Sequence, residues 1–255
     1  MRVISVNVNG IRSAATKGFF TWLDQQNADV VCLQEVRADE EQLTDLIFQP
    51  HGFKRYFFSA EKKGYSGVAI YCKQEPDNIR KGLGWDIADQ EARYIEINFK
   101  DLHIASVYLP SGTSGDERQA VKYNFLDNYL EILKQQIASN KQYILCGDWN
   151  IAHKNIDLKN WRSNQENSGF LPAERAWLDK IFDEVGFVDA YRHVNPDKAQ
   201  YTWWSNRGQA WANNVGWRID YHVVTPNLAS KIVHTDVYRE QKFSDHAPLI
   251  IDYAL

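Results

Sequence analysis

The chain has 255 residues, of which 44% are hydrophobic and 24% are charged, and its formal net charge at pH 7 is −4. This is the composition of an ordinary globular protein, and the length is sufficient to bury a large core without disulfide bonds. The small negative charge argues against a protein that coats nucleic acid through its overall charge, while local electrostatic steering stays open.

Apolar and β-branched stretches recur along the chain and predict more strands than one sheet usually holds. The predicted strands span residues 2–8, 29–34, 53–58, 66–72, 92–98, 102–108, 142–147, 219–224, 232–238 and 248–253. Helical patterns are expected at residues 16–27, 39–47, 116–138 and 174–185. In the longest of these, one apolar stripe is formed by Val121, Phe125, Tyr129, Leu133 and Ile137.

This order of elements favours an α/β fold, a four-layer sandwich in which two packed mixed β-sheets are flanked by helices. No Pro/Gly/Ser-rich linker and no charge block divides the sequence, so we expect a single domain over residues 1–255. The two halves nevertheless look roughly alike, since each begins with a strand that ends in polar residues.

The cysteines and the first residues bear on the compartment. Cys32, Cys72 and Cys146 lie within apolar stretches without CxxC or Cys/His spacing, so neither a zinc site nor a disulfide framework is expected. The first strand follows without a charged-then-apolar leader, and no apolar run approaches membrane-spanning length. We therefore expect a cytoplasmic protein, monomeric by default, with no membrane partner.

Polar residues stand at the ends of four predicted strands. They are Asn7, Glu35, Asp148 with Asn150, and Asp245 with His246. A single Gly-Asp turn or Asp-His loop contact is common and needs no function. Four such strand ends favour one composite site, because strand ends are where α/β folds hold their chemistry. Gly147 is expected to let the backbone turn sharply before Asp148.

These residue types suit a hard cation and a phosphate. Asn7, Glu35 and Asp245 offer oxygen ligands without thiolate, the set that Mg²⁺ or Mn²⁺ prefers. His246 could donate to a phosphoryl oxygen or carry a proton, with Asp220 as a candidate to orient its ring. By itself Asp220 is equally well explained as a surface carboxylate.

The remaining groups complete a hydrolytic set. Asp148 is left to activate water, Asn150 to position the water or the phosphate, and Tyr108 to donate at the same sheet edge. A tyrosine at a strand end is more often a packing residue. Together these groups predict metal-assisted hydrolysis of a phosphoester. Whether Asp148, Asn150 and His246 hold a second cation stays open.

A tryptophan-rich segment bears on the substrate. Trp203, Trp204, Trp211 and Trp217 lie near Arg207 and Arg218. Aromatic faces suit sugars or bases and cations suit phosphates, although a buried aromatic cluster would give the same pattern. Residues 155–175 carry further basic and amide side chains, which fit either a phosphate-tracking surface or a plain solvated loop.

Several motifs together resemble the exonuclease III family of apurinic/apyrimidinic endonucleases, in order and over essentially the whole chain. They are Asn7-Val8-Asn9-Gly10-Ile11-Arg12, Leu33-Gln34-Glu35, Tyr108-Leu109-Pro110, Gly147-Asp148-Trp149-Asn150-Ile151-Ala152, Ser168-Gly169-Phe170, Gly216-Trp217-Arg218-Ile219-Asp220-Tyr221 and Ser244-Asp245-His246-Ala247-Pro248. The resemblance implies a four-layer α/β sandwich and Mg²⁺-dependent cleavage of double-stranded DNA 5′ of abasic sites. Many members also trim 3′ ends.

The resemblance also implies roles for individual residues. Glu35 would be the main metal ligand, helped by Asn7 and Asp245. The catalytic groups would be Asp148 as proton acceptor, Asn150 as transition-state stabiliser, Tyr108 on the phosphate side, and the supporting pair Asp220 and His246. An apolar pocket for the flipped abasic sugar would be built from Trp203, Trp217 and Ile219. A narrow apolar slot admits a deoxyribose without its base and rejects intact nucleotides.

Two positions depart from the family pattern. Asn9 stands where some members carry Asp, so we expect it to contact substrate rather than metal. Arg207 stands where animal members carry an apolar wedge, and an arginine there could stack on a base or grip phosphate.

Two alternatives follow from the same residues. Phosphoesterases that act on inositol phosphates or sphingomyelin share the acidic scaffold, but the tryptophan-rich segment and residues 155–175 favour DNA. Catabolite repression control proteins also resemble the chain and act as RNA-associated regulators without several catalytic side chains. All five of the residues Glu35, Asp148, Asn150, Asp245 and His246 are present here, which favours catalysis.

Overall fold

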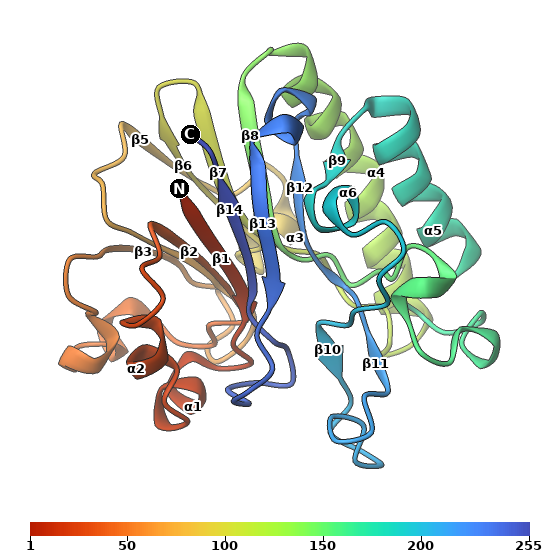
Figure 1. Ribbon diagram of the computed structural model, residues 1–255, viewed down its shortest axis with the longest axis horizontal. Coiled ribbons are helices and arrows are strands. Elements are labelled where there is room, and N and C mark those ends of the chain that lie inside the picture. Colours follow the sequence, from red (N-terminus) through yellow and green to blue (C-terminus); the bar gives the residue numbers. More distant parts are fainter.

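The computed structural model describes residues 1–255 and contains two six-stranded mixed sheets packed face to face (Figure 1). The first sheet has the order β13 (Ile232–Val237), β14 (Leu249–Tyr253), β1 (Arg2–Asn7), β2 (Val30–Gln34), β4 (Val68–Cys72), β3 (Lys54–Phe58). The second has the order β5 (Asn78–Lys81), β6 (Tyr94–Phe99), β7 (Leu102–Tyr108), β8 (Gln142–Asp148), β12 (Asp220–Val224), β9 (Val188–Asp189). A short hairpin pairs β10 (Trp203–Trp204) with β11 (Gly216–Trp217).

The two sheets repeat one pairing pattern. In each sheet the two middle strands, β1 with β2 and β7 with β8, are parallel, and all the other neighbours are antiparallel. The similarity of the two halves of the sequence therefore has a structural basis. The halves are not separate units, however, because β13 and β14 return from the end of the chain to the first sheet.

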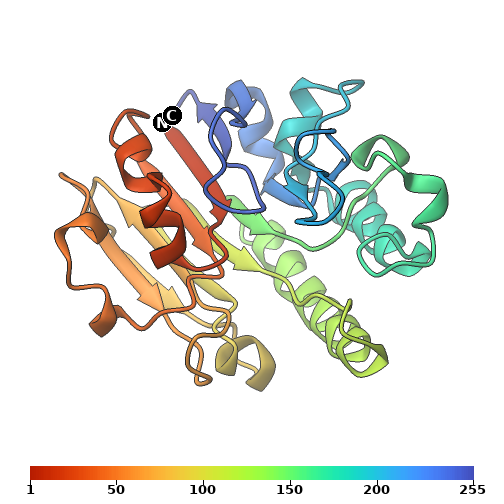
Figure 2. The same cartoon turned by 90° about the horizontal axis from the view of Figure 1, so that it is seen from below.

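Helices cover the outer faces of both sheets (Figures 1 and 2). On the first sheet lie α1 (Ile11–Thr16) and α2 (Phe19–Leu23), whose apolar residues pack with Ile4, Val31 and Tyr71. On the second lie α4 (Asp116–Ala138) and α5 (Pro172–Asp179), which is continued by a π-helical turn at Lys180–Val185. The shorter helices are α3 (Asp86–Gln90) and α6 (Ala190–Val194). None of the helices combines the length and the apolar character needed to span a bilayer.

The core has three apolar layers, one outside each sheet and one between the sheets. The layer between the sheets includes Val3, Ile70, Ile104, Ile144 and Ile251, all without exposed surface. The predicted four-layer sandwich is confirmed.

The predicted strands are all present, with ends that differ by at most two residues. The four strands that the sequence did not predict, β5, β9, β10 and β11, span only two to four residues. The helix at 116–138 has the predicted bounds. Its stripe is confirmed at Phe125, Tyr129 and Leu133, whereas Val121 and Ile137 are only half-buried because residues four apart drift round the helix.

Two predicted helices are wrong. The region 16–27 is divided, because Gly18 takes the left-handed conformation (φ 87°) between α1 and α2. The region 39–47 contains two 3-10 turns, Glu40–Gln42 and Leu46–Phe48. Its buried residues Leu43 and Phe48 are five apart, a spacing that no single face of an α-helix provides.

Candidate active site

Polar residues gather at one end of the layer between the sheets, opposite the two termini (Figure 1). Side chains alternate along a strand. Asn7 therefore lies on the same face of β1 as the buried Val3, and Asp148 lies on the same face of β8 as the buried Cys146. The polar end is formed by Asn7 of β1, Gln34 of β2, Tyr108 of β7, Asp148 of β8 and Asp220 of β12. The buried apolar part of each strand thus sets the position of the polar side chain at the strand's end.

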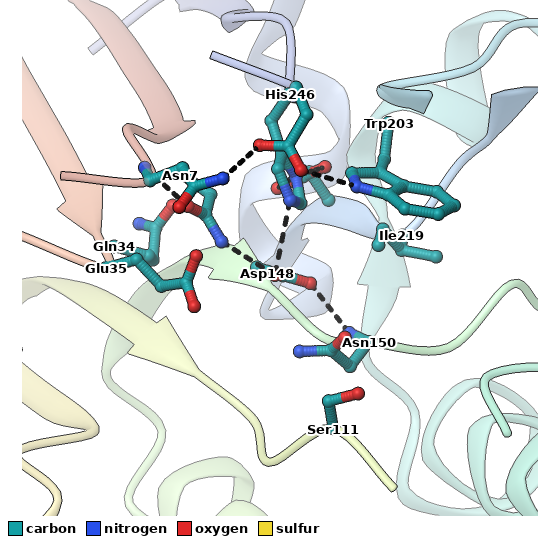
Figure 3. A network of polar contacts seen from close by, with 12 residues as sticks. Asn7, Gln34, Glu35, Ser111, Asp148, Asn150, Trp203, Ile219 and His246 are labelled. Atoms are coloured by element: carbon teal, nitrogen blue, oxygen red, sulfur yellow. Dashed lines mark hydrogen bonds and ion pairs between the residues drawn. The ribbon is translucent and has the colours of Figure 1, made fainter. Parts of the chain in front are cut away.

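Asp148 lies at the centre of the cluster (Figure 3). Its Oδ2 accepts from Asn7 Nδ2 (3.0 Å) and lies 3.8 Å from His246 Nε2, while its Oδ1 accepts from the Asn150 N–H (2.9 Å). Burial raises the pKa of Asp148 to about 7, although the neighbouring His246 and the donor Asn7 act in the opposite direction. At neutral pH the carboxyl group is thus poised between its acid and base forms.

His246 is held by Asp220. Its Nδ1 lies 2.9 and 3.1 Å from the two Asp220 carboxylate oxygens, and both residues are buried. Burial opposes charge on the ring, but Asp220 and Asp148 outweigh it and raise the pKa of His246 to about 10. The ring is therefore an imidazolium at neutral pH, with Nε2–H directed toward Asp148.

Glu35 and Tyr108 meet across the two sheets. The Tyr108 hydroxyl donates to Glu35 Oε1, which also forms an ion pair with Arg37 (3.2 Å). Burial, with Glu35 adding to it, raises the pKa of Tyr108 well above its ordinary value, so the phenol stays neutral. Glu35 itself takes the left-handed conformation (φ 51°) directly after β2, which directs its side chain to the strand edge.

The Asp245 carboxylate receives three side-chain donors. Its Oδ1 accepts from Asn9 Nδ2 (2.9 Å) and Ser244 Oγ (3.1 Å), and its Oδ2 accepts from Trp203 Nε1 (3.1 Å). Burial opposes its ionisation, but the His246 charge and the Asn9 and Trp203 donors outweigh it and lower the pKa of Asp245. Asp245 therefore stays ionised beside His246.

A small apolar cluster adjoins these acids. Its buried members are Ala152, Leu158, Phe170 and Ile219, with Trp161, Trp203 and Trp217 packed against them. The Trp203 and Trp217 rings meet edge to face at 6.3 Å between centroids, across the β10–β11 pair. The Trp203 hydrogen bond to Asp245 connects this apolar cluster to the acidic cluster.

Other aromatic and basic residues of the sequence lie elsewhere. Trp204 is fully buried and packs on Trp211, so it belongs to the core rather than to an exposed loop. Arg207 is exposed in the β10–β11 loop, and its guanidinium has no protein partner. Within residues 155–175, Arg162 and Arg175 stack on Trp161 and Phe170, each 4.5 Å from the ring centroid.

Gly147 does not make a turn, contrary to the sequence-based expectation. It lies inside β8 with φ 152°, paired with Val107 of β7. A Cβ atom there would lie 1.8 Å from the Val107 carbonyl oxygen, so close approach of the two parallel strands is what requires glycine.

The carboxylate and amide oxygen atoms of the site are the ligand type that a divalent cation prefers. Glu35 Oε2 has no hydrogen-bond partner, and Asn7 Oδ1 accepts only from the Asn9 N–H (2.9 Å). Both oxygens of Asp245 already accept from side chains. Ligand atoms of Asp148, Asp220 and His246 form a compact group, all within 4.8 Å of one another, although Asp220 occupies His246 Nδ1. The Asn150 amide is turned to the Leu109 carbonyl oxygen (2.8 Å).

Sequence reasoning missed several supporting residues. Gln34 donates to Ser106 Oγ (2.9 Å) between the sheets, beneath the acidic cluster, and its place after Cys32 in the strand alternation could have revealed it. Thr202 Oγ1 accepts from the N–H groups of Ile219 and Asp220, both at 3.1 Å. No local sequence signal marks Thr202, because its partners are far along the chain.

Comparison with known proteins gives consistent matches over the whole chain. Residues 4–246 match the family described as "Endonuclease/Exonuclease/phosphatase family". An exodeoxyribonuclease of Bacillus subtilis is 41% identical over 251 residues, which cover 98% of each chain. A DNA-(apurinic or apyrimidinic site) endonuclease of Dictyostelium discoideum is 36% identical over 98% of this chain and 69% of its own. The structure of an AP endonuclease from Archaeoglobus fulgidus superimposes with a TM-score of 0.91, at 27% identity and full coverage of both chains.

Proposed function

The chain belongs to the endonuclease/exonuclease/phosphatase family, and on this basis we propose that it hydrolyses the DNA phosphodiester bond 5′ of abasic sites and also removes nucleotides from 3′ ends. It is a hydrolase of the exonuclease III type, a DNA-repair nuclease. The family is dependent on divalent metals, and we propose Mg²⁺, with Mn²⁺ as a substitute.

One observation carries the proposal. The Asp148 carboxylate lies between the Asn7 amide and the His246 imidazolium, in a buried cluster joined to the apolar cluster through Trp203 and Asp245. A phosphate with an adjoining base-free sugar would use both parts at once. An ion pair with only a structural role at the surface would require neither this burial nor the adjoining apolar cluster.

The proposed metal ligands are Glu35 and Asn7, with Asp245 as the third group. A bound cation at these oxygens would offset negative charge on the phosphate as the transition state forms. The free Oε2 of Glu35 supports this assignment. The donors on Asp245 hold its carboxylate in a fixed direction toward the cluster.

The remaining residues move protons and stabilise charge. Asp148, whose pKa of about 7 matches neutral pH, accepts the proton of the attacking water. His246, charged and oriented by Asp220, donates from Nε2 to a phosphoryl oxygen. The Asn150 amide gives one N–H to Leu109 and keeps the second for the same phosphate. Tyr108, a neutral phenol, is a further donor on that side.

We propose that Trp203, Trp217 and Ile219 of the apolar cluster form the pocket that selects the abasic site. Burying a bare deoxyribose there requires little unstacking, because the missing base leaves the nucleotide easy to extrude. Asn9 and Arg207 are proposed to contact the DNA beside this pocket, and the guanidinium of Arg207 is exposed and unengaged.

The test uses a 5′-labelled duplex with one tetrahydrofuran abasic analogue, incubated with the protein and Mg²⁺. We expect a single product cut 5′ of the analogue, and little product with EDTA or from the undamaged duplex. In Asp148→Asn and His246→Ala, turnover should fall by about 10²-fold or more while the Kd for the duplex changes little. An intact strand at high enzyme concentration, or equal loss of affinity and turnover, would contradict the proposal.

A further inference from the structure

Lys122 of α4 and Glu174 of α5 form a fully buried ion pair behind the site. Nζ and Oε1 are 2.5 Å apart, and neither side chain has exposed surface. Burial lowers the pKa of Lys122, and the Glu174 carboxylate partly offsets this. A buried ion pair often stabilises a fold no better than apolar residues of the same volume, because both charges lose their hydration. Stability alone therefore gives little reason for this pair.

Lys122 also contacts the backbone of a site residue. Its Nζ donates to the Asn150 carbonyl oxygen at 2.8 Å. Asn150 lies in the left-handed conformation (φ 52°), and its N–H donates to Asp148 (Figure 3). Its side-chain amide donates to the Leu109 carbonyl oxygen. Asparagine takes this conformation more readily than other residues with a Cβ, and the contacts of its N–H and side-chain amide hold it there.

Glu174 binds the turn at residues 169–171, which packs against the Asn150 main chain. Its Oε2 accepts from the N–H groups of Gly169 (2.7 Å) and Leu171 (3.0 Å). A Cβ on Gly169 would lie 3.3 Å from both the Asn150 carbonyl oxygen and the Trp217 ring. The turn held by Glu174 is thus packed between Asn150 and the pocket wall.

We propose that the Lys122–Glu174 pair is a positioning device for the reaction: it sets the Asn150 main chain, and hence the direction of its free amide N–H, relative to Asp148 and the Trp217 pocket. This inference rests on the proposed role of Asn150 in phosphodiester hydrolysis. An apolar pair would fill the same volume but would leave the Asn150 carbonyl without its donor. The Asn150 main chain would then lose one of the contacts that hold it, and its free amide N–H would be less well directed toward the phosphate.

A double-mutant cycle tests the proposal with the abasic duplex as substrate. The variants are Lys122→Met with Glu174→Gln, which removes both charges at nearly constant volume, Asn150→Ala, and the combination of all three. We expect the charge-free pair to lower kcat by about tenfold or more, with KM changed less than about threefold. In the Asn150→Ala background the same pair should have no further effect on kcat, because it acts through Asn150.

The control is another buried pair beneath α4, His103 and Glu96, with Nδ1 and Oε1 2.9 Å apart. The variant His103→Phe with Glu96→Gln should lose a comparable amount of thermal stability and keep the wild-type kcat. If Lys122→Met with Glu174→Gln does not fold, Lys122→Met alone enters the same cycle, since it removes the donor to Asn150 while Glu174 keeps the N–H groups of Gly169 and Leu171.

The outcomes separate the two proposals. The positioning role would be overturned if the charge-free pair lowered kcat by the same factor with and without Asn150→Ala. It would also be overturned if the protein with the charge-free pair folded and had the wild-type kcat. Wild-type kcat in Asn150→Ala itself would instead overturn the proposed role of Asn150.

Discussion

Trp203 shows how one side chain at this site has two kinds of contact. Its ring packs against the pocket with Trp217, and its indole N–H donates to Asp245 Oδ2 at 3.1 Å. In the proposed function, recognition of the sugar and orientation of an acid would therefore depend on the same residue. A phenylalanine would supply the apolar wall but not the donor.

Trp203→Phe should lower kcat on the abasic duplex several-fold, roughly by the factor expected for a lost hydrogen bond to a charged group. KM should change little, because the apolar wall remains. The matched control is Trp204→Phe, which loses the donor to Asn214 (3.1 Å) away from the acids. That control should lower Tm and leave kcat unchanged. Equal kcat values for wild type and Trp203→Phe would contradict a role for Trp203 in orienting Asp245.

At the scale of elements, a buried charge cluster ties the segment after β8 to β12 and α6. Asp157 Oδ1 accepts from Arg218 Nε (2.8 Å) and from Arg192 Nη2 (2.5 Å), and Arg218 also pairs with Asp189 (2.8 Å). Burial would raise the pKa of Asp157, but Arg218 and Arg192 outweigh it and lower the pKa to about 2. This cluster holds Leu158, Trp217 and Ile219 in place around the pocket.

The lowered pKa of Asp157 predicts an acid dependence of stability. A carboxyl group with a depressed folded-state pKa stabilises the fold above its unfolded pKa, near 4, and loses that contribution as pH falls toward 2. The free energy of unfolding should therefore drop by about 2 kcal/mol over this window through Asp157 alone. Urea unfolding from pH 5 to pH 2.5 should show a shallower decline for Asp157→Asn; parallel curves would contradict the assignment.

Strand pairing in the second sheet predicts the effect of a single methyl group. Gly147→Ala would place Cβ 1.8 Å from the Val107 carbonyl oxygen, so β7 and β8 would have to separate. We expect a loss of stability of about 3 kcal/mol or more, seen as a much lower Tm. Gly84→Ala is the comparison, since it also has a positive φ (96°) but nothing within 4 Å of its Cβ. Similar Tm values for the two variants would show that strand contact is not what requires Gly147.

At the scale of the whole molecule, two sheets with the same pairing pattern bring their polar strand ends to one edge. The net charge of −4 means that the protein as a whole does not attract DNA. Affinity must then come from a limited number of basic side chains that face phosphates.

Affinity for the abasic duplex should therefore fall as salt rises, linearly in a plot of log Kd against log salt concentration. We expect a slope that corresponds to a few phosphate contacts, measured by fluorescence anisotropy with EDTA present to prevent cleavage. A duplex with methylphosphonate linkages around the abasic site should show a flatter plot. No salt dependence for the native duplex would contradict phosphate-based binding.

The sequence by itself determined the strands, the long helix and the residues at the strand tips. Alternation places Asn7 on the same face of β1 as Val3, and Asp148 on the same face of β8 as Cys146; this periodicity is local, so it can be read without coordinates. Which face is the inner one could not be read, because both strands are buried along nearly their whole length. The same local reading failed at residues 39–47, where burial of Leu43 and Phe48 overrides helix propensity. It also failed for the two-residue strands, which are too short to carry a period.

Only the tertiary structure decided which of these residues meet. Asn7 and Asp148 are 141 positions apart, and Trp203 and Asp245 are 42 apart. The Lys122–Glu174 pair depends on the packing of α4 against α5 and has no sequence signature at all. Periodicity records which face a side chain occupies, whereas contact depends on how separate elements pack, and that packing is set by the apolar core of the whole chain.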